Sequence, residues 1–259
     1  MNKGLRLGAV QYLNAEPLVW PLENAVISHT HTIVRAVPSK LVRMLQNGEF
    51  DCALAPITCL MDESSLVGIP EVAIACRGPV ASVLLFHNDP LKKLTTIWLD
   101  PASGTSNLLV RILRDRASAD PCNYIKLAGD EAPSVDDLPP NTGRLIIGDE
   151  ALRQSRLRTG KARFSDLGEL WRDRTGHPFT FARWIARSGE IAGELRSLFV
   201  QARDWSLLHL HELIEPLAEK YSFDPETVDR YLRVNITYMH GPREQAGERE
   251  FFLQAGKLR

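Results

Sequence analysis

The sequence lacks long apolar runs and an excess of charge of either sign. Its first residues, MNKGLRLGAVQYLN, reach the polar side chains Gln11 and Asn14 before an apolar stretch of signal-peptide length is complete, and no later stretch is long enough to span a bilayer. The 31 basic and 32 acidic residues nearly cancel, whereas binding to nucleic acid requires a positive surface. We therefore expect a cytoplasmic protein with neither a membrane nor a nucleic acid as its partner.

Cysteine is scarce, and no pair of cysteines has the C-x-x-C spacing of a metal or redox site. Three of the four thiols lie in apolar runs, where cysteine behaves as a small hydrophobic residue. We predict that all four are reduced core residues: Cys52, Cys59, Cys76 and Cys122. His209 and His211 are two apart on a predicted helix and would face different directions, so we expect no zinc site there.

The sequence does have the length and composition of a two-lobed globular protein. Its 259 residues suit two cores better than one, and 44% hydrophobic with 24% charged residues is ordinary for a folded domain. Short strand-like runs alternate with helical patterns, which favours an α/β fold. The chain is expected to form one lobe from residues 1–84 and 180–259, and a second from 85–179, with a ligand cleft between them.

The expected elements follow from apolar periodicity and capping residues. Strands are predicted at Leu5–Val10, Ile33–Val37, Cys52–Ala55, Val72–Cys76, Val80–Phe86, Thr96–Leu99, Tyr124–Leu127 and Arg144–Ile147. Helices are predicted after Ser39, after Ser103 or Thr105, and repeatedly beyond Trp184, with Asp224 capping one of them. Residues 132–142, with three prolines, indicate a surface loop.

Small polar residues follow several of these strands, at turns and helix starts that would face the cleft. Orphan N–H groups and the dipole at a helix start bind anions, so these segments favour a small carboxylate ligand. The segments are Gln11–Asn14, Pro38–Lys40, Ala55–Thr58, Arg77–Ser82 and Ser103–Ser106. A purely structural role, in helix capping and turns, is the alternative for all of them.

Individual residues have the same two interpretations. Asn14 either caps the helix that begins near Glu16 or contacts the ligand, and Asp149 either caps the helix after the strand at 144–147 or acts as a general base. Arg77 either pairs with a surface acid or binds a dicarboxylate through its planar guanidinium. Trp171 and Trp184 are expected in the core rather than as stacking surfaces.

Several runs of the sequence, taken together and in order, resemble one enzyme family. They are GAVQYLNAEPL (8–18), VPSKL (37–41), DCALAP (51–56), IACRGPVASVLLF (74–86), LDPASGTSNLL (99–109), LIIGDEAL (145–152), DLGELW (166–171) and TGHPFTFARW (175–184). The sequence is similar to the chorismate dehydratases of the futalosine route to menaquinone. That resemblance implies a type II periplasmic-binding-protein-like fold. It also implies an enzyme without metal or organic cofactor that removes water from chorismate to give 3-[(1-carboxyvinyl)oxy]benzoate. We expect no obligate protein partner.

The cleft-facing segments and the resemblance together give a set of expected site residues. Asn14 is expected to be catalytic, and the expected substrate contacts are Tyr12, Ser39, Pro56, Thr58, Arg77, Gly78, Pro79, Ser82, Ser103, Thr105, Ser106, Gly148 and Asp149. Gln11 and Gly104 depart from the family pattern, where serine and a larger polar residue are usual. These departures put individual pocket contacts in doubt but leave the reaction unchanged.

Three other functions are compatible with the same fold. The sibling family that makes 1,4-dihydroxy-6-naphthoate carries an SPCPND run and a catalytic histidine, whereas this chain has QYLN and Gly148 at those places. An exported solute-binding protein would carry a signal segment. A cytosolic ligand-sensing domain is not excluded by the fold alone.

The candidate segments offer few protein bases for a dehydration. They contain no histidine, and the two acids considered with them, Glu16 and Asp149, have capping explanations. In chorismate the proton on C3 is acidified through the ring diene, and loss of the C4 hydroxyl gives an aromatic ring. We therefore expect the substrate's own enolpyruvyl carboxylate to take the C3 proton, with Asn14 positioning that side chain or the departing hydroxyl.

Overall fold

The computed structural model describes residues 4–62, 65–126, 132–156 and 163–258. The chain forms two compact units: unit 1 comprises Met1–Ala75 and Thr180–Gln245, and unit 2 comprises Cys76–Phe179 and Ala246–Arg259. Compared with the expected lobes, residues 76–84 and the last 14 residues go with unit 2. That the units act as ligand-closing lobes stays a prediction.

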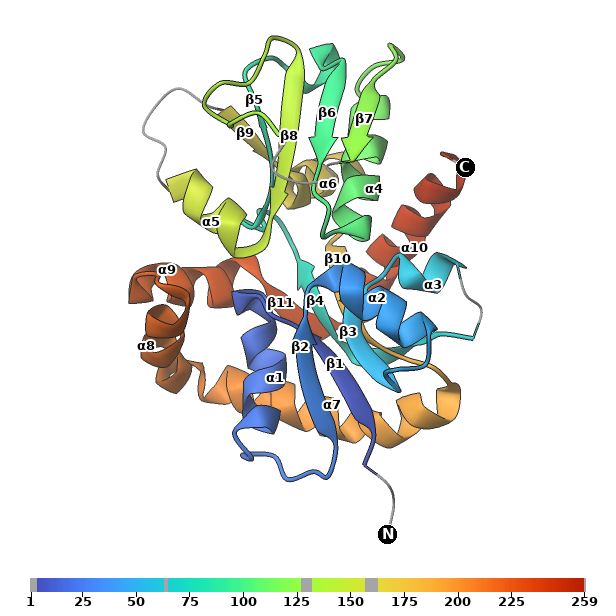
Figure 1. The fold of residues 1–259 in the computed structure, drawn as a ribbon, viewed down its shortest axis with the longest axis vertical. Helices are drawn as coiled ribbons and strands as arrows, with labels where there is room; N and C mark the ends of the chain where they lie inside the picture. Colours follow the sequence, from blue (N-terminus) through green and yellow to red (C-terminus); the bar gives the residue numbers. More distant parts are fainter. Residues whose placement is uncertain (1–3, 63–64, 127–131, 157–162, 259) are drawn as a thin grey trace. The chain divides into compact units, whose positions relative to one another are not determined.

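Unit 1 is built on a six-stranded mixed sheet with the strand order β11-β4-β10-β3-β1-β2 (Figure 1). The strands are β1 (Arg6–Val10), β2 (Thr32–Ala36), β3 (Cys52–Pro56), β4 (Val67–Cys76), β10 (Phe179–Ala186) and β11 (Thr237–His240). β1 pairs in parallel with β2 and β3, while β10 is antiparallel to β3 and β11 to β4. The carboxyl ends of β1, β2 and β3 therefore share one edge of the sheet.

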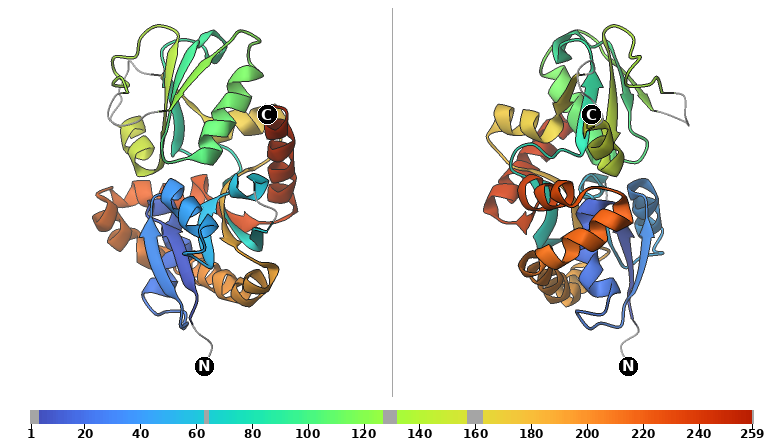
Figure 2. Two further views of the ribbon diagram at one scale, coloured as in Figure 1. Left: turned by 45° about the vertical axis from the view of Figure 1, so that its right-hand side comes forward. Right: turned by 90° about the vertical axis from the view of Figure 1, so that its left-hand side faces the viewer.

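Helices connect and cover these strands (Figure 2). They are η1 (Leu13–Ala15), α1 (Glu16–Glu23), α2 (Pro38–Gln46), α3 (Cys59–Asp62), α7 (Gly189–Leu208), α8 (Leu210–Tyr221), α9 (Pro225–Arg230) and the π-helical turn η3 (Tyr231–Asn235). α1 packs along α7, and α2 packs against β1 and β3. A Cβ atom at Gly8 would lie 2.8 Å from side-chain atoms of both Leu41 and Phe50, so glycine lets α2 approach β1 closely.

Unit 2 is built on a five-stranded sheet with the order β7-β6-β8-β5-β9 (Figure 1). Its strands are β5 (Val83–His87), β6 (Thr96–Leu99), β7 (Asn123–Lys126), β8 (Thr142–Ile147) and β9 (Arg163–Asp166). Its helices are η2 (Leu91–Lys93), α4 (Gly104–Asp115), α5 (Gly148–Arg156) and α6 (Leu167–Thr175), and most of α10 (Pro242–Gly256) also belongs to it.

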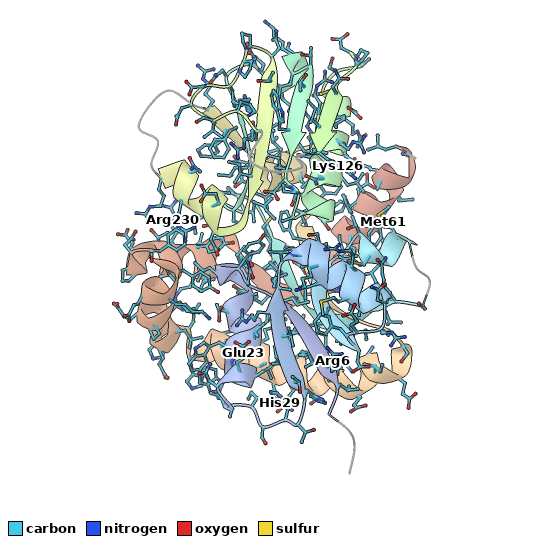
Figure 3. All side chains as sticks on the ribbon, in the orientation of Figure 1. Arg6, Glu23, His29, Met61, Lys126 and Arg230 are labelled. Carbon is cyan, nitrogen blue, oxygen red and sulfur yellow. The ribbon has the colours of Figure 1, made fainter. Side chains whose placement is uncertain are left out.

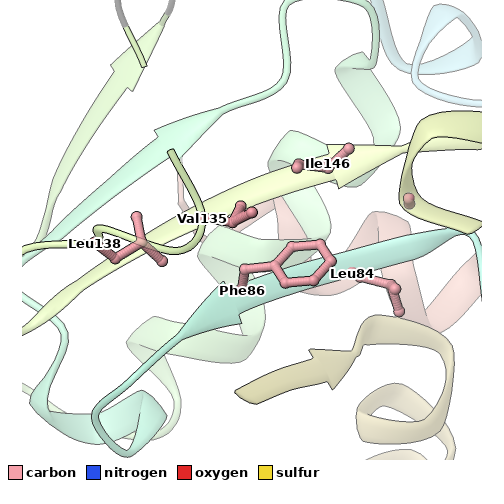
Figure 4. Packing of buried hydrophobic residues seen from close by; sticks show 6 residues of the cluster. Leu84, Phe86, Val135, Leu138 and Ile146 are labelled. Carbon is pink, nitrogen blue, oxygen red and sulfur yellow. The ribbon is translucent and has the colours of Figure 1, made fainter. Parts of the chain in front are cut away.

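Two apolar clusters stabilise unit 2. On one face of the sheet, Leu84 and Phe86 of β5 pack with Ile146 of β8, covered by Val135 and Leu138 from the loop before β8 (Figure 4). Elsewhere Trp171 of α6, Phe179 and Phe251 of α10 make edge-to-face ring contacts, with centroids 5.1 to 6.2 Å apart.

Most of the expected strands are confirmed, and the errors have local causes. Val80–Ser82 is a loop rather than strand, because the N–H groups of Val80 and Ala81 donate to Asp166 instead of to a neighbouring strand. The prediction omitted β9, β10 and β11. The last residue of the strand predicted at Tyr124–Leu127 lies outside the described residues.

The residue-type expectations are confirmed in part. Trp171 and Trp184 are fully buried. All four cysteines are free, but Cys122 is only half-buried, so its assignment to the core was wrong. His209 stands between α7 and α8, so it does not share a helix with His211 as predicted.

Within the described ranges, no helix is both long and apolar enough to cross a membrane. The same ranges contain no group of three or more histidine, cysteine or acidic side chains arranged to hold a metal ion.

Candidate functional site

Three helices of unit 2 begin at one edge of its sheet. β6 is parallel to β8, and β5 is antiparallel to both β8 and β9, so β6, β8 and β9 run in the same direction. Each of these strands is followed at its carboxyl end by a helix, respectively α4, α5 and α6 (Figure 1). Helix starts carry unpaired N–H groups and a partial positive charge. This edge can therefore bind an anion.

The first of these helix starts, at α4, contains the predicted residues Ser103, Thr105 and Ser106. Ser103 is the N-cap, and its hydroxyl oxygen accepts a hydrogen bond from the N–H of Ser106 at 3.1 Å. Its own hydroxyl group donates to Ser106 Oγ at 2.9 Å. Thr105 and Ser106 lie inside the first turn and are buried. The sequence offered Ser103 or Thr105 as the N-cap of this helix, and the structure uses Ser103.

Asp166 joins the start of α6 to the RGPVAS segment (residues 77–82). Its carboxylate accepts the N–H groups of Gly168 and Glu169 in α6 and those of Val80 and Ala81 in the segment, at 2.7 to 3.1 Å. A Cβ atom at Gly168 would lie 2.6 Å from the carbonyl oxygen of Gly78, so the two segments are in close contact. The segment that contains the predicted residues Gly78, Pro79 and Ser82 is thus held to the start of α6.

The start of α5 is hydrogen-bonded to the same segment, residues 77–82. The N–H of Gly148 donates to the carbonyl oxygen of Ser82 at 2.7 Å. Gly148 has a φ of +66°, a left-handed conformation that glycine adopts without strain. Asp149 lies in the first turn of α5 rather than before it, so its predicted capping position was wrong.

A second carboxylate, that of the half-buried Asp100, connects the ends of β6 and β8. It accepts the N–H groups of Ala102 at 2.8 Å and Ile147 at 3.2 Å. Burial raises the pKa of both Asp100 and Asp166, while the N–H groups that they accept act in the opposite direction. Sequence reasoning gave neither residue a role, although an aspartate between a strand and a helix start is a capping signal. The hydrogen bonds that Asp100 and Asp166 accept hold the strand ends and helix starts at this edge of the unit 2 sheet in fixed positions.

The corresponding edge of unit 1 contains the other predicted residues. Tyr12 and Asn14 follow β1, Ser39 follows β2, and Pro56 and Thr58 lie at and after the end of β3. α2 is capped by the main chain of Val37, with Pro38 at its first position, and Ser39 is exposed in its first turn. The prediction that Ser39 caps this helix was therefore wrong.

Asn14 lies in η1 and does not cap α1. The N-cap of α1 is Ala15, which makes no side-chain capping bond. The side-chain oxygen of Asn14 is buried and has no hydrogen-bond partner among the described residues. A buried amide oxygen normally has a partner, so this atom is a candidate to accept one from a ligand or water. The capping alternative for Asn14 was wrong.

Next to Asn14, Glu16 is fully buried and surrounded by cations. Its carboxylate contacts Arg35 at 3.0 Å and Lys220 at 3.0 Å, and it also accepts a hydrogen bond from the hydroxyl group of Tyr221. Burial acts to lower the pKa of Arg35, but the hydrogen bonds and charges of Glu23 and Glu16 raise it overall. Sequence reasoning assigned Glu16 only to helix capping and missed this cluster, because Lys220 and Tyr221 lie more than 200 residues away.

Arg77, the predicted carboxylate partner at the start of the RGPVAS segment, is exposed. Cys76, just before it, is buried, and burial raises the pKa of its thiol to about 12. The thiol is therefore protonated at neutral pH and is not a nucleophile.

The architecture is that of the periplasmic binding proteins. A protein of Archaeoglobus fulgidus superimposes with a TM-score of 0.78, at 14% identity over 99% of this chain and 98% of that one. The periplasmic aliphatic sulphonate binding protein of Escherichia coli superimposes with a TM-score of 0.68, at 15% identity over 100% of this chain and 94% of that one. At these identities the likeness establishes the fold alone.

The sequence places the chain more narrowly within this class. Residues 5–257 match the family described as menaquinone biosynthesis. The chain is 31% identical to the chorismate dehydratase of Thermus thermophilus over 87% of its length and 86% of that protein. It is 27% identical to the chorismate dehydratase of Campylobacter jejuni over 68% of its length and 65% of that protein. The chain belongs to the menaquinone biosynthesis family.

Proposed function

We propose that this protein is a chorismate dehydratase, a hydro-lyase that converts chorismate to 3-[(1-carboxyvinyl)oxy]benzoate. The observation that carries the proposal is the 31% identity to the Thermus thermophilus dehydratase, which extends over most of both chains. Chorismate is a dicarboxylate, and the anion-binding helix starts of unit 2 are chemically suited to such a substrate.

One carboxylate of chorismate binds at the starts of α4 and α5. The buried hydroxyl groups of Thr105 and Ser106 lie in the first turn of α4, and Gly148 and Asp149 lie in the first turn of α5. Ser82 is joined to the α5 start by its carbonyl oxygen. The fold holds the main-chain N–H groups at the starts of α4 and α5 in place before the substrate arrives. They therefore stabilise developing negative charge without reorganising.

The protein groups near the proposed contacts are poor candidates for the base. Glu16 is fully buried and bound to Arg35, Lys220 and Tyr221. Its carboxylate is thus already engaged by three donors. Asp149 is the other acid considered, and it lies in the first turn of α5, where acidic side chains commonly interact with the unpaired N–H groups of the helix.

The reaction balances without an external oxidant or reductant. The enolpyruvyl carboxylate of chorismate takes the proton from C3, and the electron pair of that bond delocalises through the ring diene into the ring carboxylate. The C4–O bond then breaks, hydroxide leaves, and the proton from the carboxylic acid converts it to water. The ring becomes aromatic, and Asn14 orients the enolpyruvyl group or the leaving hydroxyl through its side-chain amide.

Incubation of the purified protein with chorismate tests the proposal. We expect stoichiometric formation of 3-[(1-carboxyvinyl)oxy]benzoate, identified by chromatography and mass spectrometry, with a rate proportional to protein concentration. Chorismate that binds without turnover would contradict the proposal and indicate a sensing protein. Formation of 1,4-dihydroxy-6-naphthoate from a cyclised futalosine derivative, with chorismate left intact, would assign the chain to the sibling reaction.

A further inference from the structure

The turn that contains Asn14 is held by side chains from two other parts of unit 1. On one side, Arg35 of β2 donates to the carbonyl oxygen of Val10 at 3.1 Å, at the point where β1 ends and the turn begins. The same guanidinium group contacts the carboxylates of Glu16 and Glu23, the first and last residues of α1 (Glu23 is labelled in Figure 3). Arg35 thereby joins both ends of α1 to the end of β1.

On the other side, the last two residues of α8 reach the same turn. Lys220 contacts the Glu16 carboxylate at 3.0 Å. The hydroxyl group of Tyr221 donates to the Glu16 carboxylate and lies 3.4 Å from the carbonyl oxygen of Gln11. These contacts join residues about 200 positions apart in the chain. They enclose the Gln11–Glu16 turn, in which Asn14 lies.

The charges in this cluster are balanced, and its centre is buried. Arg35 and Lys220 supply two positive charges, and Glu16 and Glu23 supply two negative ones. The Glu16 side chain is 0% exposed, whereas that of Lys220 is 51% exposed. A buried carboxylate with several directional partners holds its segment in one geometry, and that is what a precisely placed amide needs.

We propose that Tyr221 and Lys220 are positioning residues that hold the Asn14 side-chain amide in its reactive geometry. This inference rests on the proposed function, because it names the groups that act through Asn14 in the dehydration. The end of α8 thus acts on the reaction without touching chorismate. It acts by fixing the orientation of the Asn14 side-chain amide, which contacts the substrate.

Replacement of Tyr221 by phenylalanine tests the proposal, because it removes one hydroxyl group and keeps the ring. We expect kcat to fall by about 10-fold or more while KM changes little, since a positioning error acts mainly on the chemical step. Lys220→Met should lower kcat in the same direction, and Lys220→Arg should restore most of it. Lys220 is half-exposed, so this pair gives an answer even if Tyr221→Phe does not fold.

Tyr124→Phe is the matched control. The hydroxyl group of Tyr124 donates to the carboxylate of Asp115 at 2.5 Å within unit 2, whereas the Asn14 turn belongs to unit 1. The control variant should keep the wild-type kcat. A kcat of Tyr221→Phe equal to that of Tyr124→Phe would overturn the proposal.

An NMR measurement separates this proposal from the function on which it rests. The Asn14 side-chain amide signals, identified by their loss in Asn14→Ala, should shift or broaden in Tyr221→Phe without any substrate, and remain unchanged in Tyr124→Phe. Unchanged Asn14 signals in Tyr221→Phe would overturn the positioning role even if the protein dehydrates chorismate. Shifted signals in a protein that leaves chorismate intact would contradict only the proposed reaction.

Discussion

At the residue scale, Asn14 and Glu16 lie two positions apart and have opposite environments. The Glu16 carboxylate is surrounded by donors, whereas the Asn14 oxygen is buried and has no partner in the part of the chain that the structure describes. Leaving a buried polar group unsatisfied costs about 1–3 kcal/mol, so an unpaired oxygen in the turn after a strand is a feature that folding alone does not favour. The proposed dehydration gives this oxygen a partner in the bound substrate.

Substitution of Asn14 should damage the reaction more than substitution of either nearby acid. We expect Asn14→Ala to lower kcat by about 100-fold, because a misplacement of about 1 Å can have that effect. Glu16→Gln and Asp149→Asn should keep measurable activity, since a true general base contributes roughly 10²- to 10⁴-fold. Steady-state kinetics with calorimetric binding is the measurement. An Asp149→Asn variant that binds chorismate normally but is inactive would identify Asp149 as the base.

The residue scale also predicts a pH effect at the start of β1. The ring Nδ1 of His31 accepts a hydrogen bond from the main-chain N–H of Leu5 at 3.1 Å. The main-chain N–H of His31 donates to Nδ1 of His29 (labelled in Figure 3), and the two histidine rings are stacked. Burial and the neighbouring His29 lower the pKa of His31, although Glu194 and Asp51 act in the opposite direction. The folded state therefore binds this proton less readily than the unfolded state does.

This difference in proton binding fixes the sign of the effect. Stability from His31 is fully present above the unfolded-state pKa of about 6.5 and decreases as the pH falls from there toward the lower pKa of the folded state. We expect the thermal midpoint to fall in that window, and to fall less in His31→Asn, whose side-chain oxygen can still accept the N–H of Leu5. Equal pH profiles for the variant and the wild type, measured by circular dichroism, would show that His31 is not responsible.

At the element scale, the start of α4 separates capping from ligand binding. Ser103 caps α4, whereas Thr105 and Ser106 lie in its first turn. Ser188 caps α7 in the same way, by accepting the N–H of Ile191 at 3.3 Å. α7 follows the carboxyl end of β10, which runs antiparallel to β3 and so ends at the opposite edge of the unit 1 sheet from the predicted contacts.

We expect Ser103→Ala and Ser188→Ala each to destabilise the protein by about 1 kcal/mol, the usual value of an N-cap. Thr105→Ala combined with Ser106→Ala should weaken the affinity for chorismate, and Ser188→Ala should leave it unchanged. Chemical denaturation and calorimetric titration measure the two effects. Unchanged affinity in the Thr105 and Ser106 double variant would locate the anion site elsewhere.

The same elements indicate how far local sequence predicts structure. The caps at Asp224 and Ser103 were predicted because a capping residue and its helix are adjacent in sequence. β10 was missed because it is a central strand that buries the polar residues Thr180 and Arg183. Arg183 donates to the carbonyl oxygens of Gly68 and Ile69 of β4, more than 110 residues away, and nothing in the local pattern indicates such partners.

At the scale of the whole molecule, long-range contacts decide which segments belong to each unit. Residues 76–84 were expected in the first lobe, but the Asp166 carboxylate holds Val80 and Ala81 within unit 2. The end of α10 was also expected in the first lobe, but Phe251 of α10 packs on Trp171 and Phe179 of unit 2. The α/β class and the strands from β1 to β8 were predictable from the sequence. These memberships were not, because each depends on contacts between distant residues.

The candidate site divides in the same way. The turns after strands and the helix starts were found from sequence, because small polar residues mark them locally. The residues that order those turns, Asp100, Asp166 and the Glu16 cluster, were not given these roles, because their partners come from several elements of the folded chain. A site residue that meets the substrate is thus easier to recognise in a sequence than one that holds another residue in place.

The whole reaction predicts how a modified substrate behaves. If the enolpyruvyl carboxylate of chorismate takes the C3 proton, the analogue in which that group is a neutral amide has no base, because a neutral amide is far too weak to accept the proton. We expect this analogue to occupy the site and compete with chorismate, yet to be dehydrated at least about 100-fold more slowly, the lower range for loss of a general base. Competitive inhibition and single-turnover product analysis measure the two properties separately. An amide analogue dehydrated at the natural rate would show that a protein group removes the proton, and Asp149→Asn would then be the first variant to compare.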